Sequence, residues 1–239
     1  MARRFIIKEE IVLGQEFEII GEEAKHIMVL RHDVGDEILV NDKFCEIESI
    51  AKQTVRCVAI RQAKEKGVPN TKITLFQALL KADKMEFVIQ KAVEIGATQI
   101  VPFISKNVVV KLDDKDKMKK VERWNKISVE ASKQCGRSDL VEVNKVHSFL
   151  EMLEELEKYD KVIIAYENEV NSLKEIIREN LDINNIAVII GAEGGFEKGE
   201  VEKVLENKKA VSVSLGDRIL RAETASINLL SVLMYEFEL

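Results

Sequence analysis

The order of apolar and polar positions divides the chain into two parts of different character. Residues 1 to about 70 carry short strand-like runs, over residues 5–7, 16–19, 37–40, 44–50 and 54–60. Such short runs at close spacing are typical of a small β-barrel. From residue 71 onward, strand-like runs alternate with helical patterns, and this order predicts an α/β domain with a mainly parallel sheet.

Five apolar runs of the second part predict its strands, over residues 73–78, 99–104, 162–166, 186–190 and 211–215. The run 186–190 is unbroken and ends at Gly191, which is typical of a strand buried on both faces. Helical spacing predicts helices over residues 84–94, 124–135, 196–205 and from about 224 to 237.

The last predicted helix is strongly apolar on one face. Its apolar positions are Ile227, Leu230, Leu233 or Met234, and Phe237. This face must be buried against the sheet or against a partner. Thr224 is expected to cap the N-terminus of this helix.

A linker is predicted between the two parts. Lys64–Asn70, with the sequence KEKGVPN, combines charge, a glycine and one of the two prolines of the chain. We therefore expect one domain over residues 1–70 and a second over residues 71–239.

The net charge of −6 argues by itself against a nucleic-acid-binding protein, but the charge is unevenly distributed. Residues 71–150 carry +5, whereas residues 151–239 carry −9. Because phosphate binding acts over about one Debye length, RNA requires only a local positive surface. The mixed charges of Lys111–Lys126 fit a solvated helix or loop equally well.

Composition also bears on the class of protein. No apolar run approaches the roughly 18 residues of a membrane span, and the start MARRFIIKEE lacks a signal-peptide pattern, so a cytoplasmic protein without a membrane is expected. The three cysteines suggest neither a disulfide framework nor a zinc site. His26 and His32 lack a third ligand nearby in the sequence, so no metal is expected.

Two glycine-bearing turns follow the last two predicted strands. Gly191, Gly194 and Gly195 follow residues 186–190, and Gly216 follows residues 211–215. Their spacing matches neither the dinucleotide-binding fingerprint nor the phosphate-binding loop. Ligands of open α/β sheets nevertheless bind beyond the carboxyl ends of strands, so two such turns favour a ligand site over simple chain reversal.

Six segments together carry a resemblance to a known family: RRF at 3–5, VLR at 29–31, QKAVEIGA at 90–97, EASKQCGR at 130–137, GAEGGF at 191–196 and LGDRILRAETA at 215–225. The chain resembles the RsmE family, the knotted SPOUT-type methyltransferases that methylate N3 of a uridine in small-subunit 16S ribosomal RNA. The resemblance implies a PUA-like RNA-binding β-barrel over residues 1–70. It further implies a SPOUT methyltransferase domain with a deep trefoil knot over residues 71–239, S-adenosyl-L-methionine as cofactor, and a homodimer.

The same resemblance implies the residues of the sites. The cofactor-binding residues would be Tyr166, Glu167, Gly191, Glu193, Gly194, Gly195, Phe196, Leu215, Gly216, Arg218, Ile219, Leu220, Thr224 and Ala225. The candidate RNA contacts are Arg3, Arg4, His26, Arg31, Gln134 and Arg137.

Methylation of uridine N3 sets chemical requirements. Because N3 is a weakly acidic imide, a base or a group that stabilises the developing anion must stand beside it. Arg221 is the candidate stabiliser, and Glu223 or Glu193 is the candidate base. Glu223 could equally cap backbone amides at a helix N-terminus. Phe196 is a candidate to stack on the uracil after the nucleotide leaves its stack.

Two other functions stay open at this point. One is an RNA-binding relative that has kept the fold and lost activity, against which the intact motifs at 191–196 and 215–225 argue. The other is a related knotted methyltransferase that acts on tRNA or on a ribose 2′-OH.

Overall fold

The structure is a computed structural model that describes residues 4–167, 169, 171–174 and 183–238. The chain forms two compact units. The first comprises Met1–Gly67 together with Lys133–Asp139, and the second comprises Val68–Ser132 and Leu140–Leu239. The division between Gly67 and Val68 lies inside the segment predicted as a linker.

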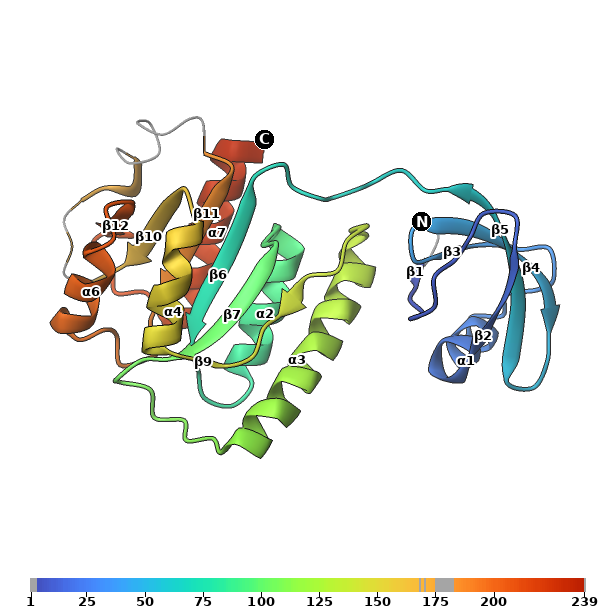
Figure 1. The fold of residues 1–239 in the computed structure, drawn as a ribbon, viewed down its shortest axis with the longest axis horizontal. Coiled ribbons are helices and arrows are strands. Elements are labelled where there is room, and N and C mark those ends of the chain that lie inside the picture. The colour runs from blue at the N-terminus through green and yellow to red at the C-terminus, as the bar shows by residue number, and fades with distance from the viewer. Residues whose placement is uncertain (1–3, 168, 170, 175–182, 239) are drawn as a thin grey trace. The chain divides into compact units, whose positions relative to one another are not determined.

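The first unit is a five-stranded sheet with one helix (Figure 1). Its elements are β1 (Arg4–Phe5), β2 (Glu16–Ile20), α1 (Gly21–Val29), β3 (Glu37–Val40), β4 (Lys43–Ile50) and β5 (Thr54–Gln62). The strand order is β1-β3-β4-β5-β2, in which β1 pairs parallel with β3 and all other pairs are antiparallel. Two register shifts between β4 and β5 mark bulges, which bend a sheet and increase its twist.

The apolar residues of these strands fill one core. Phe5, Ile19, Ile38, Ile47 and Val55 are all 0–1% exposed. All five predicted strands are present, although the first covers residues 4–5 rather than 5–7. The sheet therefore buries the face that its apolar positions define.

The hairpin between β3 and β4 turns without a glycine. Asn41 takes a positive φ of 52°, which asparagine tolerates better than most residues. Its side chain accepts a hydrogen bond from the Ile7 amide at 3.0 Å and donates one to the Ile7 carbonyl at 3.1 Å. These two bonds stabilise the unusual backbone conformation.

Lys133–Asp139 belongs to the first unit because of a buried arginine. The Arg4 guanidinium donates hydrogen bonds to the carbonyls of Asn41 at 2.6 Å, Ser138 at 2.5 Å, and Arg137. Ser138 adds a backbone hydrogen bond to the Lys66 carbonyl at 2.8 Å. From the sequence alone, residues 133–139 were assigned to the second domain, because the sequence does not show these hydrogen bonds.

The second unit is an α/β domain. Its strands are β6 (Lys72–Ala78), β7 (Gln99–Ile104), β8 (Glu142–Val143), β9 (His147–Ser148), β10 (Lys161–Ala165), β11 (Asn185–Ile190) and β12 (Ala210–Val213). They pair in the order β12-β10-β11-β6-β7-β8, with β9 also on β7, and every pair is parallel. This confirms the α/β class predicted from the sequence.

The helices of this unit are α2 (Lys84–Ile95), α3 (Asp114–Cys135), α4 (Phe149–Glu155), the 3-10 helix η1 (Leu156–Lys158), α6 (Lys198–Leu205) and α7 (Ala222–Glu238). Figure 1 shows α4 over one face of the sheet and α7 behind β6 and β11 on the other. Leu229, Leu230 and Leu233 of α7 are all 0% exposed, so this helix is anchored in the core of its own unit.

Three predicted helix boundaries were wrong. Helix α3 begins at Asp114 rather than at Trp124. Helix α6 begins at Lys198 rather than at Phe196, because the side chains of Glu197 and Glu200 form a capping box there. Helix α7 begins at Ala222, so Thr224 lies inside its first turn and is not the N-cap.

We expect Arg4→Met to destabilise the first unit by roughly 2–4 kcal/mol, because three carbonyls lose a charged donor in a buried place. Urea unfolding followed by circular dichroism measures the change. Arg56→Met is the matched control, because Arg56 makes an exposed ion pair with Glu18 at 3.0 Å and its loss should change stability little. Equal effects of the two substitutions would contradict the role assigned to Arg4.

Candidate functional site

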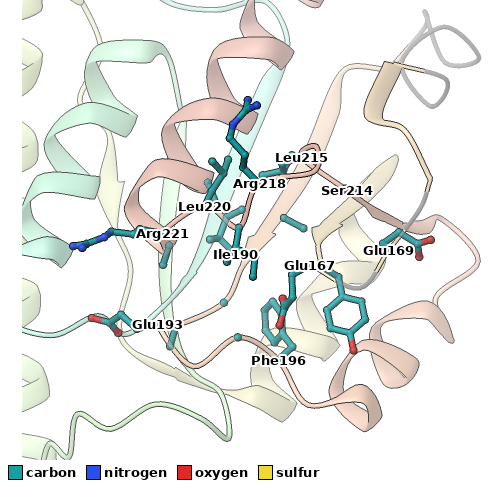
Figure 2. Close-up of a pocket in the computed structure, with 18 of the residues that line it drawn as sticks. Glu167, Glu169, Ile190, Glu193, Phe196, Ser214, Leu215, Arg218, Leu220 and Arg221 are labelled. Atoms are coloured by element: carbon teal, nitrogen blue, oxygen red, sulfur yellow. The ribbon is translucent and has the colours of Figure 1, made fainter.

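A cavity of about 660 Å³ lies at the carboxyl ends of three adjacent parallel strands, β12, β10 and β11. The segments that follow these strands form its wall, and α2 and α7 add residues to it (Figure 2). Ligand sites of open parallel sheets lie at this edge, and their volumes are about 300–1,000 Å³. The cavity therefore has the position and size of a small-molecule site.

The structure brings the predicted cofactor-binding residues together, with one exception. The cavity is lined by Tyr166, Glu167, Gly191, Glu193, Gly194, Gly195, Phe196, Leu215, Gly216, Arg218, Ile219, Leu220 and Ala225. Thr224 does not line it and is exposed. Because Thr224 lies in the first turn of α7 rather than before the helix, we correct its assignment as a cofactor contact.

Sequence reasoning missed other residues of the wall, namely Lys84, Ala165, Glu169, Ile190, Ala192, Ser214, Asp217 and Ala222. All but Lys84 lie within two residues of a predicted position, so the predicted strand ends pointed to this part of the wall. Lys84 belongs to a helix far away in the sequence, and no local pattern pointed to it.

The turn after β11 depends on residues without a side chain. Gly195 has a φ of +64°, and a Cβ there would lie 2.6 Å from Glu167 Oε1. A Cβ on Gly194 would lie 2.9 Å from the Cβ of Asn107, whose amide donates to the Gly194 carbonyl at 3.0 Å. Close packing on both sides therefore fixes this turn and keeps its backbone accessible to the cavity.

Buried hydrogen bonds tie the same turn to the sheet and to α7. Gln77 of β6, which is 0% exposed, donates to the Gly191 carbonyl at 3.3 Å. Ser226 of α7 donates its one hydroxyl proton to Gln77 Oε1 at 2.5 Å, and the Ala222 carbonyl lies 3.0 Å from the same hydroxyl oxygen. One buried amide thus connects β6, the glycine turn and the last helix.

Phe196 serves the core rather than the open cavity. It is 6% exposed, and its ring stacks on Phe103 with 6.4 Å between centroids and 9° between the planes. A Cβ on Gly191 would lie 3.1 Å from this ring. The expectation that Phe196 stacks on a uracil is therefore corrected, because Phe103 already stacks on this ring and only 6% of the residue is exposed.

Glu193 and Glu223 both lie close to Lys84. Lys84 Nζ is 3.3 Å from Glu193 Oε1 and 3.7 Å from Glu223 Oε2. Burial raises the pKa of the Glu193 carboxyl, but hydrogen bonds from the backbone amides of Glu193 and Lys81, together with Lys84, outweigh burial and lower this pKa overall. A carboxylate that binds protons weakly is a poor base, so Glu193 is the weaker of the two candidates.

Arg218 and Arg221 are exposed residues of the cavity wall. Figure 2 shows Arg221 and Glu193 extending to the same side, away from Glu167, whereas Arg218 extends in another direction. Within the described part of the chain, neither guanidinium makes a hydrogen bond or an ion pair with protein. Both are therefore available to an anionic ligand.

The candidate RNA contacts fall into two groups. Arg4 and Arg137 are 7% and 3% exposed, and Arg137 pairs with Asp139 at 2.7 Å, so we correct both to structural residues of the first unit. Arg31 and Gln134 are exposed, and His26 is half-buried with its ring 5.7 Å from that of Phe5. Arg3 lies outside the described residues.

Over the residues that the structure describes, no cluster of three or more His, Cys, Asp or Glu side chains is placed to hold a metal ion. The helices within the same described ranges include none that is long and apolar enough to cross a bilayer.

Comparison with known proteins identifies the class. Residues 67–234 match the family described as RNA methyltransferase domain. Ribosomal RNA small subunit methyltransferase E of Bacillus subtilis (strain 168) is 38% identical over 252 residues, which cover 100% of this chain and 98% of that protein.

Two solved structures agree with the whole fold. Ribosomal RNA small subunit methyltransferase E of Neisseria gonorrhoeae bound to S-adenosyl methionine has a TM-score of 0.88 and 26% identity, and the match covers 98% of each chain. A methyltransferase of Legionella pneumophila in complex with the same cofactor has a TM-score of 0.86 and 29% identity, again over 98% of each chain.

The parallel sheet with its strand-end cavity is thus that of an RNA methyltransferase whose cofactor is S-adenosylmethionine. The chain belongs to the ribosomal RNA small subunit methyltransferase E family.

The cavity fits this cofactor. Gly216 lines the wall and a Cβ there would meet nothing within 4 Å, so a ligand has room against the main chain at this position. Glu167, Glu169 and Glu193 give the wall carboxylates, which suit a ligand with an amino group, hydroxyl groups and a positively charged sulfur.

We expect Gly195→Ala to abolish measurable cofactor binding while the chain stays folded. The alanine would have to adopt a strained positive φ, and its Cβ would clash with Glu167. Calorimetric titration with S-adenosylmethionine measures the affinity. Gly199→Ala is the matched control, because a Cβ at Gly199 would meet nothing within 4 Å. Normal affinity in folded Gly195→Ala protein would contradict the assigned role of the turn.

Proposed function

We propose that this protein transfers a methyl group from S-adenosylmethionine to N3 of a specific uridine in small-subunit 16S ribosomal RNA. The observation that carries the proposal is the cavity at the strand ends, with the free Arg221 on its wall, in a chain that aligns over its whole length with small-subunit methyltransferases. Because this RNA is made and assembled in the cytoplasm, we propose that the protein works there.

When bound, S-adenosylmethionine supplies a methyl group on a positively charged sulfur, and the protein then mainly has to align the reactants. In this proposal the turns at 191–195 and 214–220 hold the cofactor against the strand ends. Arg221 stabilises the negative charge that appears on uracil as N3 loses its proton.

Glu223 is the proposed proton acceptor. Glu193 is engaged by the Lys81 amide at 3.2 Å and has a lowered pKa. Glu223 makes no hydrogen bond in the described part of the chain, and its Oε2 atom is buried. A side chain with unused acceptor capacity is better suited to take a proton than one whose acceptors are engaged.

We propose that the first unit is a PUA-like RNA-binding domain. Its small bent sheet and the exposure of Arg31 and Gln134 support this role. His26 stays a candidate, because its ring is only half-buried. We expect the double variant Arg31→Ala, Gln134→Ala to lose affinity for the target RNA. Unchanged affinity would contradict the proposal.

We further propose that the second unit contains a trefoil knot. Strand β12 lies at the sheet edge, whereas α7 packs on β6, β11 and α2, so residues 214–221 must cross the end of β10. True knots are rare in folds, and such a crossing is one of their requirements. Pulling the two ends of a single molecule tests this, because a knotted chain stops short of its full contour length.

Nucleoside mass spectrometry tests the proposed reaction. Purified protein and S-adenosylmethionine are incubated with small subunits, with naked 16S RNA and with tRNA, each from cells that lack the gene. N3-methyluridine in the small-subunit RNA is the expected product. A 2′-O-methyl nucleoside, a product in tRNA alone, or no product despite cofactor binding would each favour one of the alternative functions.

We expect Arg221→Ala to lower single-turnover methylation by roughly 10²–10³, the scale for losing one anion-stabilising donor, while cofactor affinity changes little. Arg218→Ala is the comparison, because Arg218 extends in another direction and should affect cofactor affinity instead. A near-normal rate at saturating substrate would remove Arg221 from the catalytic residues.

We propose a homodimer formed through α7 and its surroundings. A hollow of about 530 Å³ lies beside the cavity, lined by Asn228, Val232 and Glu236 of this helix together with residues 172–174 and 214–216. Tyr235 on the same helix is 67% exposed. Asn228 and Glu236 are exposed as well, whereas Val232 and Leu215 also pack in part against the core of the unit.

Tyr235→Glu should convert the proposed dimer into a folded monomer, because Tyr235 is exposed in the single chain and a second copy would bury the new charge. Sedimentation at micromolar concentration measures the mass. Leu205→Glu is the matched control, because Leu205 is 40% exposed on α6 and does not line this hollow. A monomeric unmodified protein would refute the dimer.

A further inference from the structure

Lys84, the first residue of α2, is a part of the cavity wall to which no role has been assigned. Its ammonium faces two carboxylates that come from other parts of the chain, Glu193 after β11 and Glu223 in the first turn of α7. The side chains of Lys84, Glu193 and Glu223 are 34%, 23% and 16% exposed. The ammonium group of Lys84 thus lies close to two partly buried carboxylates.

The two carboxylates depend on Lys84 to different degrees. Glu193 also accepts a hydrogen bond from the Lys81 amide at 3.2 Å. The buried Oε2 atom of Glu223 has no hydrogen bond in the described structure, and Lys84 is the cation placed against it, at 3.7 Å. A buried carboxylate oxygen without a hydrogen-bond donor depends on a nearby cation, so Lys84 is the group that stabilises the Glu223 carboxylate in this position.

We propose that Lys84 is a positioning residue for methyl transfer, which holds Glu223 ionised beside the cavity so that Glu223 accepts the proton of the target nitrogen. This inference rests on the proposed function. Lys84 acts through Glu223 and does not itself have to touch the substrate.

The step balances in charge and atoms. The N3–H bond breaks, its proton passes to a Glu223 oxygen, and the electron pair of N3 forms the bond to the methyl carbon. The sulfur–methyl bond breaks, and its electrons stay on sulfur, which becomes neutral. Glu193 then remains as the counter-anion of Lys84, so the ammonium keeps a partner after Glu223 is neutralised.

The charged groups around Glu223 predict opposite effects of two substitutions. Lys84 of α2 favours its ionised form, whereas Glu193 after β11 competes for Lys84 and opposes it. Lys84→Met should therefore make the Glu223 carboxylate less stable relative to its protonated form. Glu193→Gln should make this carboxylate more stable, because all of the attraction of Lys84 becomes available to Glu223.

Two measurements test the proposal on the full-length protein. The first is the pH dependence of single-turnover methylation of small-subunit RNA. The second is a carbon-13 titration of glutamate carboxyls without RNA, in which the Glu223→Gln variant identifies the Glu223 signal. The titration needs no activity, so it stays informative even if the RNA substrate is different.

We expect the acid limb of the rate profile and the Glu223 titration to move together. In Lys84→Met both move to higher pH, and the rate on the acid limb falls about tenfold for each unit of the displacement. In Glu193→Gln both move to lower pH. Lys84→Arg should keep the normal profile, and so should Lys91→Met, which removes an ion pair with Glu94 elsewhere on α2.

An unshifted Glu223 titration in folded Lys84→Met protein would overturn the proposal, as would a shift to higher pH in Glu193→Gln. If Lys84→Met fails to fold, Glu193→Gln alone decides by the direction of its shift. Absence of N3-methyluridine with the unmodified protein would instead overturn the proposed function and the proton step, while the titration still decides whether Lys84 controls Glu223.

Discussion

The cavity depends on a buried polar side chain in the middle of the sheet, Gln77 of β6. A buried amide must have its hydrogen bonds satisfied, since each unsatisfied group costs about 1–3 kcal/mol. Gln77 donates hydrogen bonds to the Gly191 and Ala78 carbonyls and accepts one from the Ser226 hydroxyl. The start of the glycine turn and the first turns of α7 are therefore fixed relative to the strand, and the two halves of the cavity wall are fixed with them.

The first unit is held by a comparable constraint, although with a charged group. Arg4 is 7% exposed, and its donors face carbonyls from Asn41, Arg137 and Ser138. Burial lowers the pKa of this guanidinium, while Asp139 and Asp42 raise it. Planar guanidinium donors suit such a cluster of carbonyls, which explains an arginine inside a small core. A charged residue near a chain end thus serves folding rather than a ligand.

Gln77 and Arg4 show which features of the structure could not be predicted from the sequence alone. Strands such as 186–190 were predictable because runs of apolar residues specify buried strands by themselves. The turns at 191–195 and 216 were predictable because glycines after a strand mark a turn locally, although the contacts of Gln77 and Asn107 that fix the first turn were not. Arg4 and Lys84 were not, because their roles depend on partners more than 100 residues away in sequence, such as Arg137 and Glu193. A charged residue in the sequence indicates that its side chain needs a partner, but only the fold shows whether that partner is protein or ligand.

The net charge of −6 likewise says little about the local charge on the surface of the protein. Several basic residues of the region 71–150 are used internally, for example Arg123 with Glu86 at 2.7 Å and Lys117 with Asp114 at 2.9 Å. Lys115, Lys119 and Lys126 of α3 are exposed and make no ion pair within the described part of the chain. At about 3.6 residues per turn, these three positions lie on one side of the helix. The exposed Glu122 lies on the same side, so three free ammonium groups stand against one carboxylate there. This side of α3 is therefore a local positive surface of the kind that phosphate binding requires, and carboxylates farther away than about one Debye length do not cancel it.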